Sequence, residues 1–384
     1  MDVKPRYKQT AVGIIPDDWE VILLASVAAY TNGKAHEKCI SDLGKYIVVN
    51  SKFVSTNGEV IKYSDHPLSL ASKGEILMVM SDVPNGRAIA RCFLVDRDER
   101  YTVNQRICAI RPLHVDGKLL AYKLDRNPYY LAFDDGVKQT NLRKDDVLSC
   151  PLAFPPTKVE QEAIAGVLTD ADALIESLEQ LIAKKHHLKQ GAMQELLIGK
   201  KRLPGFSGAW EVEALGEVAS ATKGTQLPRS ETSDNDRFPH LNGGITPSGY
   251  AERANTPGGT IAISEGGNSC GYVQFMVGEY WCGGHCYSVV PRSIDNRFLY
   301  HALKTRQDSI MALRVGSGLP NVQKTALLAF KLSLPGNVLE QTAIAIILSD
   351  MDAEIATLEV KLAKIRRLKQ GMMQELLTGR IRLL

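Results

Sequence analysis

The chain of 384 residues lacks features that mark several large classes of protein. Its seven cysteines are odd in number and scattered, which predicts no disulfide framework. The longest apolar run, Val21–Tyr30, is about ten residues and too short to cross a bilayer. Residues 1–10 are polar and charged, unlike a signal peptide. We therefore expect a cytoplasmic protein of two or three domains. Its net charge of +3 permits an anionic partner without requiring one.

Motifs of common catalytic centres are also missing. The sequence has no Gly-x-x-x-x-Gly-Lys-Ser/Thr phosphate loop and no His-Glu-x-x-His metal motif. Residues 126–130 approach the Asn-Pro-Pro-Tyr motif with which amino-methyltransferases hold a flipped base. The second proline is absent, however, and no glycine-rich cofactor loop follows a strand at a suitable distance. An ordinary turn after a helix is the favoured interpretation.

Clusters of metal-ligand type are weak. Cys282 and Cys286 flank a Gly-Gly-His segment, with Cys270 upstream, but this spacing does not match structural zinc motifs. Small buried cysteines around a glycine turn are favoured. His186 and His187 lie in a cationic stretch, where a solvated helix face is favoured over a metal site. The sequence thus predicts no catalytic residue, no metal site and no cofactor bound by this chain.

What the sequence does contain is a long repeat. Residues 154–203 align without a gap onto residues 334–383, at a constant offset of 180 and with about 27 of 50 positions identical. Asp170, Asp172 and Glu195 recur in the second copy and could suggest paired catalytic acids. No nucleophile or base accompanies them, so surface charge or contact with a partner is the better interpretation.

Each copy has the pattern of one long helix, because apolar residues recur alternately every three and four positions. No proline interrupts either stretch, and Gly199 and Gly379 stand where the helices should end. Each helix should span roughly 35–40 residues, or about 55 Å. Two matching seams predict an antiparallel coiled coil between the copies; two helices buried in separate domains is the alternative. The predicted seam residues are Ile164, Leu168, Ile175, Leu178, Ile182, Ile344, Leu348, Ile355, Leu358, Leu362 and Ile365.

The segments that precede the two copies are alike only at scattered points. Both contain short apolar runs bounded by Gly, Asn, Ser and Asp, which predicts α/β modules with many short strands. Each opens on Trp-Glu-Val, at Trp19 and at Trp210. We therefore predict two modules of like fold with different loops, in residues 1–153 and 204–333. They are separated by an antiparallel pair of long helices in residues 154–203 and 334–384, so that the whole chain is a pseudo-two-fold internal repeat.

From end to end the chain resembles the specificity subunits of type I restriction–modification systems. The resemblance rests on the Ile-Ile-Pro-Asp-Asp-Trp-Glu-Val opening and on the repeated Glu-Gln-x-Ala-Ile-Ala helix start and Lys-Gln-Gly-x-Met-Gln-Glu-Leu-Leu helix end. A short link between the first helix and the second module also fits. These segments are residues 14–21, 155–165, 335–345, 189–199, 369–379 and 202–206.

The resemblance implies a DNA-reading scaffold without catalysis of its own. Two target-recognition domains, residues 1–153 and 204–333, would each read half of a bipartite target in double-stranded DNA. The coiled coil would set the spacer and dock two methyltransferase (M) subunits, and restriction/motor (R) subunits could join. S-adenosylmethionine would be bound on the M subunits. The alternatives are a coiled-coil assembly scaffold without a direct DNA role, and an enzyme in its own right.

If the chain reads DNA, polar side chains on loops should reach base edges in the major groove. Segment 137–144 is the strongest candidate for combined base and phosphate contact, with a solvated loop as the alternative. Glu265 could accept a hydrogen bond from a cytosine amino group or cap a helix. The candidates in the first module are Asn85, Arg87, Asn104, Gln105, Arg106, Lys138, Gln139, Thr140, Asn141, Arg143 and Lys144; those in the second are Asn242, Asn268, Ser269, His285, Ser317, Asn321 and Lys324.

Overall fold

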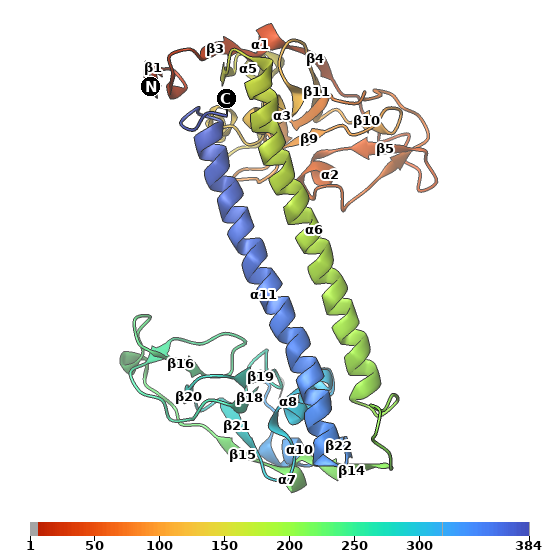
Figure 1. Ribbon diagram of the computed structural model, residues 1–384, viewed down its shortest axis with the longest axis vertical. Coiled ribbons are helices and arrows are strands. Elements are labelled where there is room, and N and C mark those ends of the chain that lie inside the picture. The colour runs from red at the N-terminus through yellow and green to blue at the C-terminus, as the bar shows by residue number, and fades with distance from the viewer. Residues whose placement is uncertain (1–6, 317, 384) are drawn as a thin grey trace. The chain divides into compact units, whose positions relative to one another are not determined.

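The computed structural model describes residues 7–316 and 318–383. The chain forms two compact units, Met1–Ser177 with Leu362–Leu384, and Leu178–Lys361. Two helices of 39 residues each, α6 (Lys158–Leu196) and α11 (Val338–Leu376), begin in one unit and end in the other (Figure 1). The prediction of two long uninterrupted helices is confirmed.

The first unit is built around two sheets. An antiparallel sheet has the strand order β4–β11–β7–β9, and a second sheet has the order β10–β5–β6, with β10 parallel to β5. The strands of these sheets are β4 (Ala28–Asn32), β11 (Ile107–Pro112), β7 (Ile76–Val79), β9 (Cys92–Leu94), β10 (Tyr101–Val103), β5 (Tyr46–Val49) and β6 (Tyr63–Ser64).

Shorter elements complete the first unit. Three two-stranded pairs join β1 to β2, β3 to β13 and β8 to β12. Their bounds, with those of the short helices, are β1 (Tyr7–Thr10), β2 (Gly13–Pro16), β3 (Glu20–Leu23), β13 (Pro151–Phe154), β8 (Ser81–Asp82), β12 (Thr140–Asn141), α1 (Leu24–Val27), α2 (Ser51–Ser55), α3 (Gly117–Leu124), α4 (Pro128–Leu131) and α5 (Lys144–Leu148).

The second unit has the same topology. Its antiparallel sheet has the order β15–β21–β18–β19, and its second sheet has the order β17–β16–β20, with β16 parallel to β20. The elements are β15 (Ala219–Lys223), β21 (Cys286–Pro291), β18 (Thr260–Ser264), β19 (Val273–Met276), β17 (Tyr250–Ala251), β16 (Phe238–Leu241), β20 (Trp281–Cys282), β14 (Trp210–Ala214), β22 (Lys331–Pro335), α7 (Leu215–Val218), η1 (Arg229–Glu231), α8 (Asn296–Thr305), α9 (Gln307–Met311) and α10 (Lys324–Leu328).

All four residues of β7 are buried, because alternate side chains of a strand point to opposite faces of its sheet and both faces are covered. Ile76 and Met78 belong to the core that includes the long helices, whereas Leu77 and Val79 belong to a core beneath the second sheet. This explains why the sequence shows a continuous apolar run here, without the alternation of a half-exposed strand.

The repeated helical sequence performs the same task in each unit. Ile164, Ala165 and Leu168 of α6 lie in the core of the first unit. Their repeat equivalents on α11, Ile344, Ala345 and Leu348, lie in the core of the second unit together with Leu196 of α6. The repeat equivalent of Leu196, Leu376 of α11, lies in the core of the first unit. Each unit therefore consists of one α/β module, the beginning of one long helix and the end of the other.

Within each unit the two long helices lie antiparallel and are joined by matching ion pairs. In the first unit Lys369 Nζ lies 2.5 Å from Asp172 Oδ1. The repeat equivalents, Lys189 and Asp352, form the same pair in the second unit. Every predicted seam residue is buried or half-buried. The fold is therefore the antiparallel coiled coil with two α/β modules that the sequence predicted.

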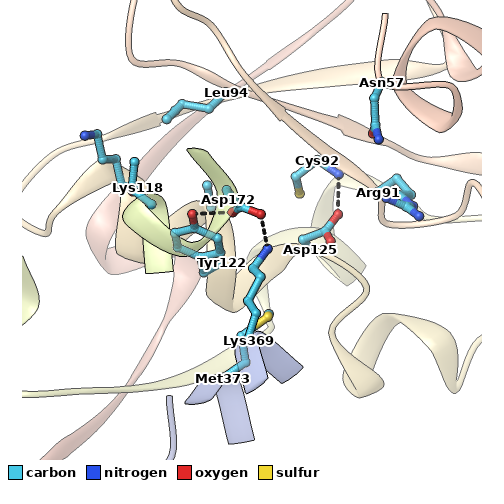
Figure 2. A pocket seen from close by; sticks show the side chains of 12 residues that line it. Asn57, Arg91, Cys92, Leu94, Lys118, Tyr122, Asp125, Asp172, Lys369 and Met373 are labelled. Carbon is cyan, nitrogen blue, oxygen red and sulfur yellow. Dashed lines mark hydrogen bonds and ion pairs between the residues drawn. The ribbon is translucent and has the colours of Figure 1, made fainter. Parts of the chain in front are cut away.

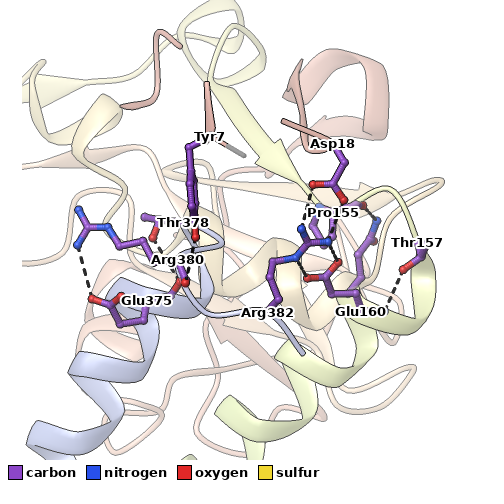
Figure 3. A network of polar contacts seen from close by, with 10 residues as sticks. Tyr7, Asp18, Pro155, Thr157, Glu160, Glu375, Thr378, Arg380 and Arg382 are labelled. Atoms are coloured by element: carbon purple, nitrogen blue, oxygen red, sulfur yellow. Dashed lines mark hydrogen bonds and ion pairs between the residues drawn. The ribbon is translucent and has the colours of Figure 1, made fainter. Parts of the chain in front are cut away.

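A half-buried arginine, Arg382, ties the segment that follows α11 to the start of α6 in the first unit (Figure 3). The Arg382 guanidinium donates to both carboxylate oxygens of Glu160, over 2.5 and 2.7 Å, and to Asp18 over 2.9 Å. The Glu160 side chain is only 2% exposed. These bonds raise the pKa of Arg382 and lower that of Asp18. The repeat equivalents Arg202 and Glu340 form a bidentate pair in the second unit.

Removing one partner of this buried pair should leave the other charge unpaired. We expect Arg382→Ala to lower the free energy of unfolding of the first unit by about 3 kcal/mol. Thermal unfolding followed by circular dichroism measures the change. Arg380→Ala is the matched control, because Arg380 is largely exposed and its pair with Glu375 is 3.5 Å long; its cost should stay below about 1 kcal/mol. Equal midpoints for the two variants would contradict the interpretation.

Lys123 is buried in the first unit, where its side chain donates a hydrogen bond to a carbonyl at the end of α11. Its Nζ donates to the Leu377 carbonyl oxygen over 2.8 Å and lies 5.1 Å from the centroid of the Trp19 ring. The carbonyls at a helix C-terminus have no partner within the helix, and this one is satisfied by the lysine. Burial lowers the pKa of Lys123 from 10.5 to about 7, because desolvation disfavours its charged form. The equivalent residue of α8 is Ala302.

This burial makes the stability of the first unit depend on pH. Between pH 7 and about 10 the unfolded chain holds the lysine proton and the folded chain does not, so stability rises with pH. We expect wild-type protein to gain about 2 kcal/mol from pH 7 to pH 9 relative to Lys123→Met. Denaturant unfolding of both proteins across this range measures the difference. Parallel curves would show that Lys123 keeps its proton in the folded state.

Candidate functional site

Polar loops gather at one edge of the sheet in the first module. Met80 N donates to Arg106 O over 3.0 Å, and Leu142 N donates to Met80 O over 2.8 Å. Strand β8 pairs with β12, so the loops after β7 and before α5 run side by side. The Gln139 amide donates to Ser81 Oγ over 2.7 Å. We call residues 32–34, 80–88, 104–106 and 136–144 the first polar edge.

Most candidates of the first module lie exposed on this edge. Asn104 is half-buried, and its side-chain oxygen accepts from the backbone of Arg106. Thr140 departs from the predicted set, because it is buried and its hydroxyl cannot reach a ligand at the surface. The exposed candidates are Asn85, Arg87, Gln105, Arg106, Lys138, Gln139, Asn141, Arg143 and Lys144.

Acidic side chains shape the loops of the first polar edge. Asp135 Oδ1 accepts from the backbone N–H groups of Val137 and Lys138, over 2.9 Å each, and these bonds lower the pKa of Asp135. Asp82 Oδ2 accepts from Ala88 N over 2.6 Å. Both carboxylates are thus held by backbone donors of their own loops. The cationic side chains of this edge remain directed to its surface.

The second module has an equivalent edge with different side chains. Glu265 N donates to His285 O and Val322 N donates to Glu265 O, over 2.8 Å each. We call residues 223–225, 242–244, 265–269, 283–285 and 319–324 the second polar edge. It surrounds a cavity of about 450 Å³ whose polar lining includes Lys223, Asn242 and Asn321.

The other candidates of the second module are spread over this edge. Asn268, His285 and Lys324 are exposed. Ser269 is half-buried, and its hydroxyl donates to Gly243 O over 2.9 Å. Ser317 lies outside the described residues. The structure thus brings Asn242, His285 and Asn321 to one cavity, whereas Asn268, Ser269 and Lys324 are not part of its lining.

Glu265 does not cap a helix, because it directly follows strand β18 and its carboxylate contacts two side chains. Its Oε1 accepts from Lys223 Nζ over 2.7 Å, and its Oε2 lies 3.2 Å from His285 Nδ1. The carboxylate is 11% exposed at the cavity. Lys223 is absent from the predicted set, because it precedes its partner by 42 residues. Strand β21 brings the two together, because it pairs with β15 on one side and with β18, which Glu265 follows, on the other.

Two glycines that sequence reasoning missed allow the strands to approach the turns of these edges. A Cβ atom on Gly33 would lie 2.1 Å from Asn104 O, and one on Gly224 would lie 2.2 Å from Cys282 O. Both follow the first strand of their sheet directly. The close approach is a tertiary contact, so no local signal could have identified it.

The remaining motifs have structural roles. Asn127 Oδ1 accepts from Tyr129 N and caps α4, whose first residue is Pro128, so residues 126–130 start a short helix. All seven cysteines are free. Across residues 7–316 and 318–383, no group of three or more His, Cys, Asp or Glu could hold a metal ion. In the same part of the chain, no helix is long and apolar enough to cross a membrane.

A pocket of about 400 Å³ in the first unit is lined by α3, α6 and α11 (Figure 2). Tyr122 OH donates to Asp172 Oδ2 over 2.7 Å, and Lys369 holds the other oxygen of that carboxylate. Burial raises the pKa of the Cys92 thiol. The contacts of Asp172 with Tyr122 and Lys369 fix α3 on the long helices.

Exposed apolar side chains recur at equal positions of the two repeats. Val159 and Leu339 are 75% and 71% exposed, and Leu188 and Leu368 are 51% and 56% exposed. Val159 and Leu368 belong to the first unit, and Leu339 and Leu188 to the second. Each unit therefore exposes an apolar residue at these two repeat positions of its long helices.

Comparison with known proteins identifies the family. The family model described as "Type I restriction modification DNA specificity domain" matches residues 16–184 and 208–367. The chain belongs to this family. Two matched stretches, each covering one module and much of the helix that follows it, agree with the internal repeat of the fold.

Two relatives illustrate the range of similarity. A protein of Mycoplasma pneumoniae that carries the name of a type I specificity subunit is 32% identical over 172 residues, 44% of this chain and 46% of that protein. The chain thus matches about half the length of this relative, and 42% of the length of another from Mycoplasma genitalium. The specificity subunit of a type I restriction enzyme of Methanocaldococcus jannaschii is 24% identical over 96% of this chain and 94% of its own.

Solved structures share the fold. The crystal structure of a type I restriction–modification S subunit from M. genitalium has a TM-score of 0.73 and 21% identity, and the match covers 97% of this chain and 99% of that one. A chain from a study of type I complex assembly and conformational transition has a TM-score of 0.51 and 17% identity, over 96% of this chain and 99% of that one.

Proposed function

We propose that the chain is the non-catalytic subunit that reads DNA sequence in a type I restriction–modification complex. Each module reads one half of a bipartite target in double-stranded DNA. In this proposal residues 1–153 and 204–333 are the target-recognition domains, and residues 154–203 and 334–384 are the connectors. The observation that carries it is one backbone frame, built twice, whose two polar edges differ in chemistry.

The first polar edge supports contact with a polyanion. Arg87, Arg106, Lys138, Arg143 and Lys144 are exposed there, while nearby carboxylates are occupied by backbone donors. Cationic side chains of this kind mostly bind phosphates and fix the register of a protein on the duplex. The exposed Asn141 amide beside them makes one contact through each of its two polar atoms and retains one donor and one acceptor site, the pair that adenine requires.

The duplicated helices support the docking of two copies of one partner. The modules differ, yet exposed apolar residues stand at matching positions of the two long helices, Val159 with Leu339 and Leu188 with Leu368. Two like surfaces fit two like subunits. In this proposal two methyltransferase subunits bind there, restriction/motor subunits can join them, and S-adenosylmethionine is bound by the methyltransferase subunits. Helices α6 and α11 link the modules, so their length sets the spacer between half-sites.

A binding experiment tests DNA reading directly. The full chain is combined with its methyltransferase subunit. The affinity of this complex for duplexes that carry its target sequence, identified as the site methylated in the host, is measured from 50 to 200 mM salt. Affinity should fall steeply with salt, because bound phosphates release counterions. Arg106→Ala with Lys138→Ala should weaken binding and reduce the salt slope by about 2, or about 1 for each phosphate contact.

Lys73→Ala is the matched control, since Lys73 is exposed at the other end of β7, in the same module. It should leave affinity and slope unchanged. A salt-independent complex would favour the assembly scaffold, and methyl transfer from labelled S-adenosylmethionine by the chain alone would contradict a non-catalytic subunit.

A further inference from the structure

Equal backbone positions of the two polar edges can be identified from their hydrogen bonds. Met80 N donates to Arg106 O in the first module, and Glu265 N donates to His285 O in the second. Leu142 N donates to Met80 O, as Val322 N does to Glu265 O. Glu265 is therefore the equivalent of Met80, and His285 is the equivalent of Arg106.

Strand register adds a third position. In the first sheet Cys108, one residue after the first residue of β11, pairs with Asn32. In the second sheet Tyr287, one residue after the first residue of β21, pairs with Lys223. Lys223 is thus the equivalent of Asn32. The same three positions hold Asn32, Met80 and Arg106 in one module and Lys223, Glu265 and His285 in the other.

The chemistry at these positions differs in kind. In the first module Tyr30 OH donates to Asn32 Oδ1 over 2.7 Å and lies 2.9 Å from the Met80 sulfur. The Arg106 side chain is exposed beside them. In the second module a carboxylate takes the place of the thioether, held by Lys223 through one oxygen and facing His285 through the other.

The Glu265 carboxylate retains acceptor capacity toward the cavity. An ionised carboxylate has about four acceptor sites, and these two contacts use one site on each oxygen. Lys223 also offsets its negative charge, which would otherwise repel the phosphates of a duplex. The site is therefore an acceptor for hydrogen-bond donors, built into a cavity of about 450 Å³ beside Asn242 and Asn321.

We propose that Glu265 is a specificity-determining residue of the second module and accepts a hydrogen bond from an exocyclic base amino group in the major groove. Lys223 and His285 hold the carboxylate in place. This inference rests on the proposed function. Cytosine N4 and adenine N6 are the amino donors of the major groove, whereas guanine and thymine present acceptors there. The second half-site therefore contains one position that requires cytosine or adenine.

Selection from a random duplex library tests the assignment. The full chain with its methyltransferase subunit binds the library, and the bound duplexes are sequenced. Wild-type protein should enrich one base pair at the position that Glu265 reads, with its cytosine or adenine on a fixed strand. The position whose preference falls in Glu265→Gln shows which amino group is read. Glu265→Gln adds a donor to an isosteric side chain, so the preference at that position should fall about tenfold or more. The first half-site should not change.

Glu279→Gln is the matched control, because Glu279 is an exposed carboxylate beyond the opposite end of the same sheet. It should leave both half-sites unchanged. Unchanged preferences in Glu265→Gln would overturn the assignment while leaving DNA reading intact. A loss of preference across both half-sites would also overturn it, because Glu265 would then be a structural residue. A wild-type complex that enriches no sequence would instead remove the proposed function.

Discussion

The constraint on which each unit depends is an ion pair between a buried glutamate at the start of one repeated helix and an arginine that follows the other. Glu160 and Glu340 lie where α6 and α11 begin, and each is almost inaccessible to solvent. A carboxylate there is tolerated only because Arg382 or Arg202 arrives at the end of the other helix with a bidentate match. The pairing fixes which helix end meets which helix start, and so it specifies the antiparallel arrangement within each unit.

Repetition of the backbone frame explains how one chain carries two different surfaces. Residues that support the sheet edge are repeated in backbone position, whereas side chains at the edge are free to differ. Gly33 and Gly224 keep the frame alike by admitting a carbonyl oxygen where a side chain would clash. Arg106 and His285 then occupy one position of that frame with different hydrogen-bonding groups. Variation at the edge leaves the core and the helices undisturbed.

The long helices could be predicted from the sequence because their apolar pattern is local and occurs in both copies of the repeat. The apolar period predicted α6 and α11 with their length, and the shared Trp-Glu-Val landmarks predicted modules of like fold. It could not pair Lys223 with Glu265, since strand register decides that contact. The burial of Thr140 could not be predicted either, because β12 has two residues and is too short to show an alternating pattern. Local periodicity fixes elements, whereas the chemistry of the edges arises from tertiary contacts.

The central claim is that the repeated helices set spacing while the modules set sequence. Deleting one heptad at the same place in both copies, residues 175–181 and 355–361, removes about 10 Å of helix and preserves the seam. Methylome sequencing of a host carrying the shortened chain with its methyltransferase partner gives the outcome. The account predicts the same two half-sites separated by a spacer about three base pairs shorter. An unchanged spacer, or altered half-sites, would contradict it.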